Sequence, residues 1–200
     1  MQKVALSVIL AFTFYGCASS VKYIGPDSQE YISASLDLND IKKAAKEMLD
    51  ALFKSGYFQS LPFDPPSTLA VSDFVNDTTI KLDVEQITTR ITEELQNSGK
   101  FQITRAMSGS GGNTDMMIDE ARKARGNEEF NQESVIKKGQ LISASLSLTG
   151  KIGQRITKLE DKQRVDYFFK IEINDLKSGL VKWSKTIDIS KIAPDNASIW

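Results

Sequence analysis

The segment TLAVSDF, from Thr68 to Phe74, opens the part of the sequence that decides the fold. It is a short apolar run of the kind that forms a buried strand. Asp83 can cap a helix after it, the sequence NSG at 97–99 closes that helix, and FQIT at 101–104 forms a second strand. A strand, a helix and a strand in close succession favour parallel pairing through a right-handed crossover. The apolar residues that share one face of this helix are Val84, Ile87, Ile91 and Leu95.

The C-terminal part of the sequence predicts an antiparallel meander. Residues 141–156 alternate irregularly as one long strand, residues 163–173 return after a polar turn, and residues 180–190 continue after a second turn. The sequence therefore predicts an α/β (α+β) fold, with a mixed parallel and antiparallel sheet of about four to five strands flanked by helices. The apolar residues on one face of the middle strand are Val165, Tyr167, Phe169, Ile171 and Ile173.

Three further helices are predicted outside these segments. Apolar residues at helical spacing over 41–53 indicate a helix that is capped by Asn39 and ends near Gly56. Its apolar face fits core packing better than a membrane surface or a partner helix. A helix is expected from Thr114 to Arg125, where the clustered methionines would fill the core, and a shorter one over 132–138.

The segment MSGSGGN, residues 107–113, is rich in glycine and is predicted to be a flexible loop. A phosphate-binding loop would need a G-x-G-x-x-G pattern or a glycine-rich turn followed by Lys-Ser/Thr, and this segment has neither. Nucleotide binding is therefore not expected.

Composition excludes several classes of function. The chain has 200 residues, of which 40% are hydrophobic and 26% charged, as in one ordinary globular domain. Lys and Arg total 25 against 26 for Asp and Glu, so there is no net field to gather nucleic acid or anionic lipid.

The sequence has no histidine and one cysteine, which removes the usual zinc sites, Ser-His-Asp and Cys-His catalysis and an internal disulfide. No metal, cofactor or catalytic residue is predicted. A hydrolase would need two carboxylates that converge from different elements. The adjacent acidic pairs at 93–94, 119–120 and 128–129 are instead expected on solvated faces, because neighbouring helical residues point about 100° apart.

The N-terminus has the pattern of an export signal. Met1-Gln2-Lys3 is short and cationic, and residues 4–15 form an uncharged, mostly apolar run that is too brief to span a bilayer as a mature helix. Residues 1–16 are therefore predicted to be a signal peptide. The alternatives for the cysteine that follows are a lipid-modified residue and a buried or free thiol behind a conventional signal peptide.

Gly16, Cys17 and the small residues at 18–20 resemble the bacterial lipoprotein box. The resemblance implies that the Cys17 thiol receives diacylglycerol, that cleavage precedes it and that the new amino group is acylated, so that the protein is held in a lipid bilayer. Ala18 in place of Asp implies sorting to the outer membrane, facing the periplasm. Residues 17–38 would be the lipidated N-terminus and tether, in which the 20 residues 18–37 reach about 70 Å, and residues 39–200 one globular domain.

Three segments carry a second resemblance. They are LAVSDFVNDT at 69–78, SVIKKGQLISA at 134–144 leading into LTGKI at 148–152, and DLKSGLVKW at 175–183. In this order, and behind a lipoprotein box, they resemble the LpoB-type lipoproteins, which are outer-membrane activators of class A penicillin-binding proteins. The curli-secretion and TolB amino-terminal domains are more distantly similar.

This resemblance implies a non-catalytic domain that binds the small regulatory domain of a bifunctional peptidoglycan synthase and stimulates it. The alternative is a structural or secretion-linked envelope lipoprotein of the curli-secretion type, which would assemble into a ring. Most residues of the three segments are expected to be structural; Gly150, for example, fits a close approach of strands. The residues proposed for the partner surface, from the motif loop at the end of a strand, are Asp73, Phe74, Asn76, Asp77 and Thr78.

Overall fold

The computed structural model describes residues 33–197, which form a curled sheet with helices on one face. Residues 1–32, with the predicted signal peptide, Cys17 and most of the predicted tether, lie outside the described residues. The helices are α1 (Leu38–Phe53), α2 (Gly56–Ser60), α3 (Val84–Asn97) and α4 (Met116–Lys123). The strands are β1 (Ser67–Asp77), β2 (Phe101–Ile103), β3 (Leu146–Leu159), β4 (Lys162–Asp175) and β5 (Val181–Pro194).

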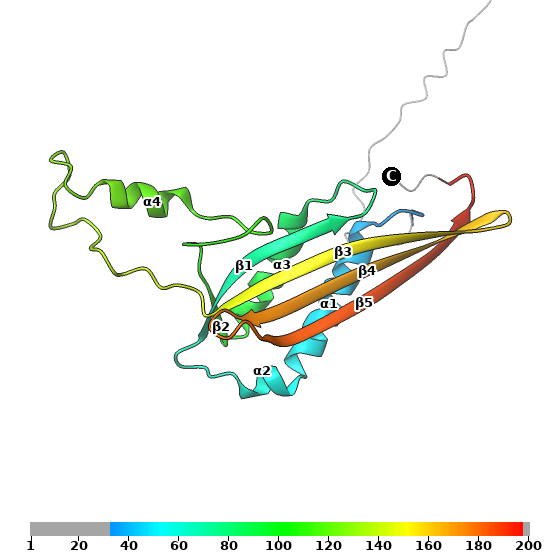
Figure 1. Cartoon of the computed structure of the whole chain (residues 1–200), viewed down its shortest axis with the longest axis horizontal. Coiled ribbons are helices and arrows are strands. Elements are labelled where there is room, and N and C mark those ends of the chain that lie inside the picture. The colour runs from blue at the N-terminus through cyan, green and yellow to red at the C-terminus, as the bar shows by residue number, and fades with distance from the viewer. Residues whose placement is uncertain (1–32, 198–200) are drawn as a thin grey trace, which may run out of the picture. The chain divides into compact units, whose positions relative to one another are not determined.

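The sheet has five strands in the order β2-β1-β3-β4-β5 and curls as a half-barrel (Figure 1). β1 pairs in parallel with both β2 and β3, whereas β3, β4 and β5 form an antiparallel meander. The predicted mixed sheet, the parallel pair around α3 and the C-terminal meander are all confirmed. The third strand begins at Leu146 rather than at residue 141. Residues 141–145 lead into it without regular secondary structure.

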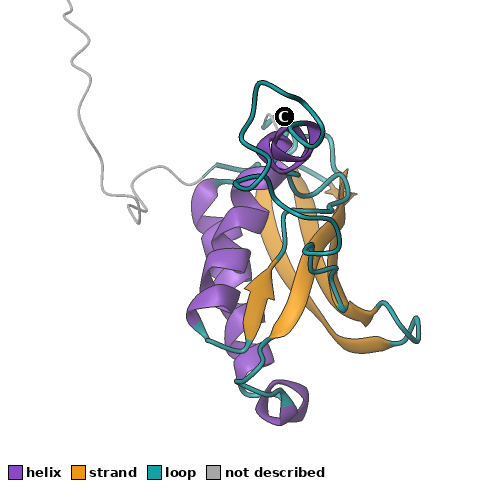
Figure 2. Cartoon of the chain, turned by 90° about the vertical axis from the view of Figure 1, so that its left-hand side faces the viewer, coloured by secondary structure: helices purple, strands orange, loops and turns teal. Residues whose placement is uncertain are grey.

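Helices α1 and α3 cover one face of the sheet (Figure 2). Between them and the strands lies one apolar core, to which β4 contributes every second residue. The predicted inward row of β4 is confirmed, since all of its members are buried: Val165, Tyr167, Phe169, Ile171 and Ile173. The expectation that the α1 stripe packs in the core is also confirmed, with Ala44, Ala45, Met48, Leu49 and Leu52 buried.

The first helix begins two residues earlier than predicted. Asp37, not Asn39, is its N-cap, and Asp40 at the third helical position completes a capping box by accepting from the Asp37 N–H. Gly56, expected to end this helix, instead begins the short α2 after a cap at Ser55. Asp83 caps α3 as predicted.

The segment between β2 and β3 differs most from the sequence predictions. α4 projects away from the sheet and contains no buried residue (Figure 1). Met116 is 76% exposed, so the expectation that the methionines fill the core is wrong. No helix forms over 132–138: the side-chain amide of Gln132 instead donates to three backbone carbonyls, those of Ala124, Asn127 and Phe130.

The glycine-rich segment 107–113 is fastened to β1. Gly109 N–H donates to the Val71 carbonyl and Gly111 N–H to the Ser72 carbonyl, along the edge that β2 leaves open. A Cβ at Gly111 would lie 2.7 Å from the Ser72 carbonyl oxygen, so a side chain there would collide with the strand. These glycines therefore allow two backbones to approach closely.

Candidate interaction surface

The face of the sheet opposite α1 and α3 is exposed across β3, β4 and β5. Side chains alternate along a strand, so the buried row of β4 leaves the other row facing outward. Cross-strand register places outward residues of three strands side by side. The exposed members of this outward face on β3 and β4 include Lys151, Arg155, Arg164, Phe168 and Lys170.

Two rungs of this outward face, each a row of residues paired across neighbouring strands, include residues from the end of β1. In the first, Val75 pairs with Lys151 and Lys151 with Lys170. In the second, Asp77 pairs with Gly153 and Gly153 with Phe168. We call the exposed side chains that β1, β3 and β4 contribute to these two rungs the outer-face patch: Val75, Asp77, Lys151, Phe168 and Lys170.

The aromatic residue of the outer-face patch lies next to a glycine. Phe168 is 36% exposed, and a Cβ at Gly153 would lie 3.5 Å from its ring. Gly153 is buried although it faces outward. A ring beside a glycine on an open sheet shields the backbone while keeping one side available for contact.

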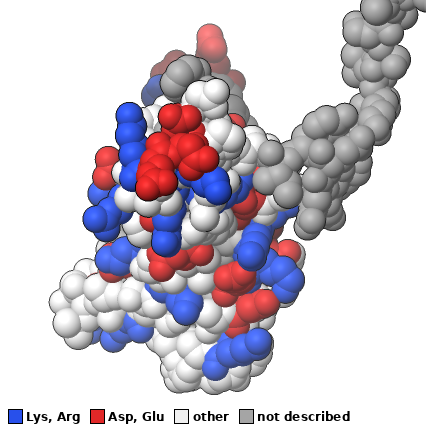
Figure 3. Space-filling view, turned by 90° about the vertical axis from the view of Figure 1, so that its right-hand side faces the viewer, with Lys and Arg blue, Asp and Glu red and all other residues white. Residues whose placement is uncertain are grey.

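The three charged residues of the outer-face patch take part in ion pairs. The Lys151 ammonium lies 2.7 Å from the Asp77 carboxylate, and the Lys170 ammonium lies 2.7 Å from Glu172 on the same strand. Hydrogen bonds from Ser190 and Arg164 lower the pKa of Asp166, further along β4. Figure 3 shows Lys, Arg, Asp and Glu interspersed, with no large area of one sign in that view.

Only part of the predicted partner surface reaches the surface. Phe74 is 8% exposed and packs against Gly150 in the core, so the expectation that its ring is available to a partner is wrong. Asp73 is exposed, and its carboxylate accepts from the N–H and the hydroxyl of Ser110, 2.9 and 3.0 Å away. The hydrogen bond from the Ser110 N–H lowers the pKa of Asp73. Asp73 therefore fixes the 107–113 segment.

The remaining predicted residues end β1 and begin the turn that follows it. The Asn76 side-chain carbonyl accepts from the N–H and hydroxyl of Thr78, while its amide donates to the Ile80 carbonyl 2.7 Å away. These bonds close the turn, which is the structural role expected of an Asn at a strand end. Asp77 alone among the five belongs to the outer-face patch.

The sequence did not single out the other four members of the patch: Val75, Lys151, Phe168 and Lys170. The signal for Phe168 was present, because it interrupts the outward, polar row of the strand predicted over 163–173. Lys151 could be added only once the register of β3 against β1 was known.

Metal-binding clusters and membrane-spanning helices are both absent from the part of the chain that the structure describes. Within residues 33–197, no group of three or more acidic, histidine or cysteine side chains could hold a metal ion. The adjacent acidic residues at 93–94, 119–120 and 128–129 are exposed, as predicted. No helix among the described residues is both long and apolar enough to cross a membrane.

Comparison with known proteins finds one protein family whose model matches this chain. The family model described as "Peptidoglycan-synthase activator LpoB" matches residues 40–189. No curated protein sequence matches the chain.

Similar solved structures include the LpoB C-terminal domains of Salmonella enterica and Escherichia coli. They are 12% and 14% identical, each with a TM-score of 0.44, and each alignment covers 76% of this chain and 99% of that domain. Lipoprotein GNA1162 from Neisseria meningitidis is 13% identical with a TM-score of 0.35, covering 66% of this chain and 87% of that one.

Proposed function

This chain belongs to the LpoB family of peptidoglycan-synthase activators, and from that premise we propose that it binds and activates a bifunctional synthase of the class A penicillin-binding type. The observation that carries the proposal is the extent of the family match. Residues 40–189 include nearly all of α1, all of the first four strands and most of β5, so the match spans nearly the whole described domain. The secretion-linked alternative is not favoured by this membership.

The activator would act on its partner without chemistry of its own. A bifunctional synthase polymerises glycan and cross-links peptides in its own active sites, and a regulatory domain outside those sites would receive the activator. Binding energy can shift such a partner only if the activator prefers its active conformation. This role requires an exposed recognition surface and no catalytic group.

We infer that the outer-face patch contributes to that recognition. It places an aromatic side chain among fixed charges on a rigid sheet, and such rigid aromatic anchors often dominate the binding energy of an interface. The ion pair between Lys151 and Asp77 is exposed, so it would add specificity more than affinity.

We further propose that Cys17 is acylated and holds the chain in the outer membrane, with the domain in the periplasm. The lipoprotein box supports this proposal, and several acyl chains on one residue give a far stronger anchor than a single myristoyl chain. Metabolic labelling with an acyl-chain analogue would test it. The parent chain should incorporate label and fractionate with outer membrane, whereas Cys17→Ser should do neither; labelling of the variant would contradict the assignment.

Activation is tested with purified proteins. A Cys17→Ser chain lacking residues 1–16 is mixed with class A synthases from the same cell, and glycan polymerisation and cross-linking are measured. Binding with a raised polymerisation rate is expected. If no such synthase is bound or stimulated, the proposed function is wrong.

The surface is tested by comparing two aromatic substitutions. Phe168→Ala should weaken binding to the synthase by at least about tenfold, because an anchor at the centre of an interface is lost. Phe63→Ala removes a more exposed ring outside the patch and should leave the affinity unchanged. Equal affinity for the two variants would place the interface elsewhere while leaving activation itself intact.

A further inference from the structure

Residues Ser33 to Asp37, which precede α1, form a strap against the sheet. Leu36 in this strap is 7% exposed and belongs to the apolar core. Asp37 at its end is the N-cap of α1. The strap is therefore part of the folded domain, although the sequence predicts these residues as tether.

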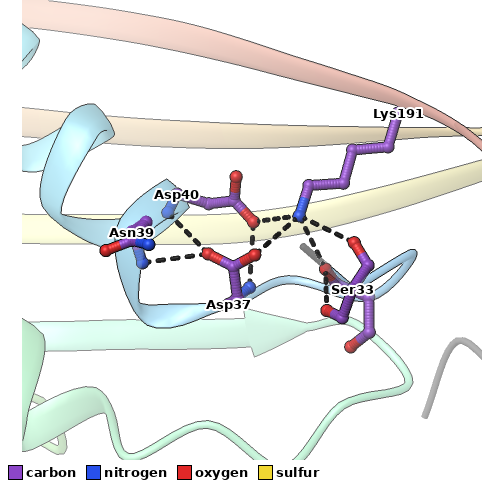
Figure 4. A network of polar contacts seen from close by, with 6 residues as sticks. Ser33, Asp37, Asn39, Asp40 and Lys191 are labelled. Carbon is purple, nitrogen blue, oxygen red and sulfur yellow. Dashed lines mark hydrogen bonds and ion pairs between the residues drawn. The ribbon is translucent and has the colours of Figure 1, made fainter. Parts of the chain in front are cut away.

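One lysine on β5 holds the strap. The Lys191 ammonium lies 3.1 Å from the Ser33 carbonyl oxygen and 2.9 Å from that of Ser35 (Figure 4). It also lies 3.1 Å from the Asp37 carboxylate and 2.5 Å from that of Asp40. An ammonium has three N–H donors, so these four oxygens supply all the partners it can use.

The two carboxylates around Lys191 are themselves fixed. Asp37 accepts from the N–H groups of Asn39 and Asp40 at 2.9 and 3.0 Å, and Asp40 accepts from the Asp37 N–H at 2.9 Å. The N-terminus of α1 thus presents two oriented negative groups to the lysine. Because their positions are set by the helix, the lysine joins α1, the strap and β5 at one point.

The position of Lys191 in the sheet makes this contact costly to lose. It pairs with Val165, so it belongs to the row that faces the helices. Its side chain is only 12% exposed. A charge placed there is tolerated only when it is paired, because desolvation of an unpaired ammonium is unfavourable.

We propose that Lys191 is a latch that fastens the strap to β5 and so sets the point at which the N-terminal chain leaves the domain. Its consequence rests on the proposed function: if Cys17 is anchored in lipid, the span available between anchor and latch is that of residues 17–33. That length of chain reaches at most about 55 Å, compared with about 70 Å if the tether continued to Asp37.

Hydrogen exchange on the purified Cys17→Ser chain tests the latch directly. Lys191→Met should speed exchange of the Asp37 and Asp40 amides at least about tenfold, because the strap opens locally. The amides of Phe169 and Ile171 in β4 should stay protected, which shows that the sheet remains folded. Lys182→Met, on the same strand but bonded to Asp175 rather than to the strap, is the matched control and should change none of these amides.

A second variant keeps the test decisive if Lys191→Met unfolds the sheet. Asp40→Asn retains a side-chain oxygen to accept from the Asp37 N–H but removes one of the two charges that face Lys191. It should speed strap exchange less than Lys191→Met does, with β4 still protected. Strap amides that exchange at the parent rate in a folded Lys191→Met or Asp40→Asn chain would overturn the proposal, and since no synthase or lipid is present, that outcome would leave the proposed function untouched.

Discussion

At the residue scale, the pairing of β1 with β3 depends on one glycine. The ring of Phe74 on β1 occupies the space where a Cβ of Gly150 would lie, with Cδ1 only 2.6 Å from that position. The two residues are direct partners in the parallel ladder, just beyond an irregularity after Val71. Gly150 therefore allows a large aromatic side chain to enter the core at the junction of the parallel and antiparallel parts.

Gly150→Ala should lower the free energy of unfolding by roughly 1–3 kcal/mol, because the ring must move to admit the methyl group. Gly153→Ala is the control: its Cβ would be in ordinary contact with Phe168, and loss of glycine flexibility is slightly favourable, so the change should stay within about 0.5 kcal/mol. Urea denaturation measures both. Equal stabilities for the two variants would contradict the steric argument.

Asp37 gives the fold a pH dependence of known sign. Burial raises the pKa of its carboxyl, but the hydrogen bond from the Asp40 N–H and the Lys191 ammonium outweigh burial, so the pKa lies below 3.8. A carboxyl with a depressed pKa in the folded state stabilises the fold above its ordinary pKa. That contribution is lost as the pH falls through the lower, folded-state pKa.

Asp37→Asn isolates this effect, because asparagine is also a good N-cap. The variant should be less stable than the parent at pH 7, and the difference should shrink as the pH falls below 3.8. Thermal unfolding at a series of pH values measures it. Other carboxyls with lowered pKa, such as Asp73 and Asp175, are present in both chains and cancel in the comparison. A difference that stays constant down to pH 2 would exclude the charge as its cause.

At the scale of elements, helices with similar amphipathic patterns differ in what they contact. α1 buries five residues against the sheet, whereas α4 buries none and lies on a segment that projects from it. Met48 in α1 is 3% exposed, while Met117 in α4 is 67% exposed. Hydrophobic spacing alone therefore does not tell a core helix from one that stands apart.

Substitution of these methionines should separate the two helices. Met48→Ala should cost about 2–5 kcal/mol of stability, as expected for a cavity in the core. The double substitution Met116→Ser and Met117→Ser should change stability by less than about 1 kcal/mol, because both side chains are already in solvent. Denaturation midpoints at matched conditions provide the measurement; a large loss in the α4 variant would mean that this helix packs against the domain.

The elements that could be predicted from sequence are those in which local pattern and burial agree. The alternation over 163–173 and the cap at Asp83 are local signals, and the core reinforces both. The region between β2 and β3 could not be predicted, since its shape depends on side-chain bonds to the backbone, such as those of Gln132, that compete with helix formation. The outer-face patch required the register of three strands, and no single segment contains that information.

The start of α1 depends partly on local sequence and partly on a contact with a distant strand. Asn39 and Asp37 are both acceptable N-caps, and Asp37 is selected by Asp40 three residues later and by Lys191 on a distant strand. The first of these signals is visible in the sequence as an acidic residue at the third helical position. The second appears only when β5 is folded beside the helix.

At the scale of the whole molecule, the latch and the proposed lipid anchor would together limit how far the domain reaches from the membrane. If Cys17 is fixed in the outer membrane and Ser33 at the sheet, the domain can reach at most about 55 Å from the membrane at that point. If the outer-face patch binds the synthase, it would have to do so within that distance plus the width of the domain. The distance that the domain can extend from the membrane and its affinity for the partner are therefore separate requirements. Different experiments can test each of them.

Removal of residues 20–27 would shorten this span by about 28 Å without touching the strap or the sheet. In cells that depend on this activator, the shortened chain should lose function, because its domain no longer reaches the synthase. The same deletion in the purified Cys17→Ser chain should stimulate the synthase as well as the parent does, since no membrane limits the approach. Replacement of residues 20–27 by an equal length of Gly and Ser should preserve function in cells, which excludes a sequence requirement. Full activity of the shortened chain in cells would show that the span from Cys17 to the latch does not limit activation.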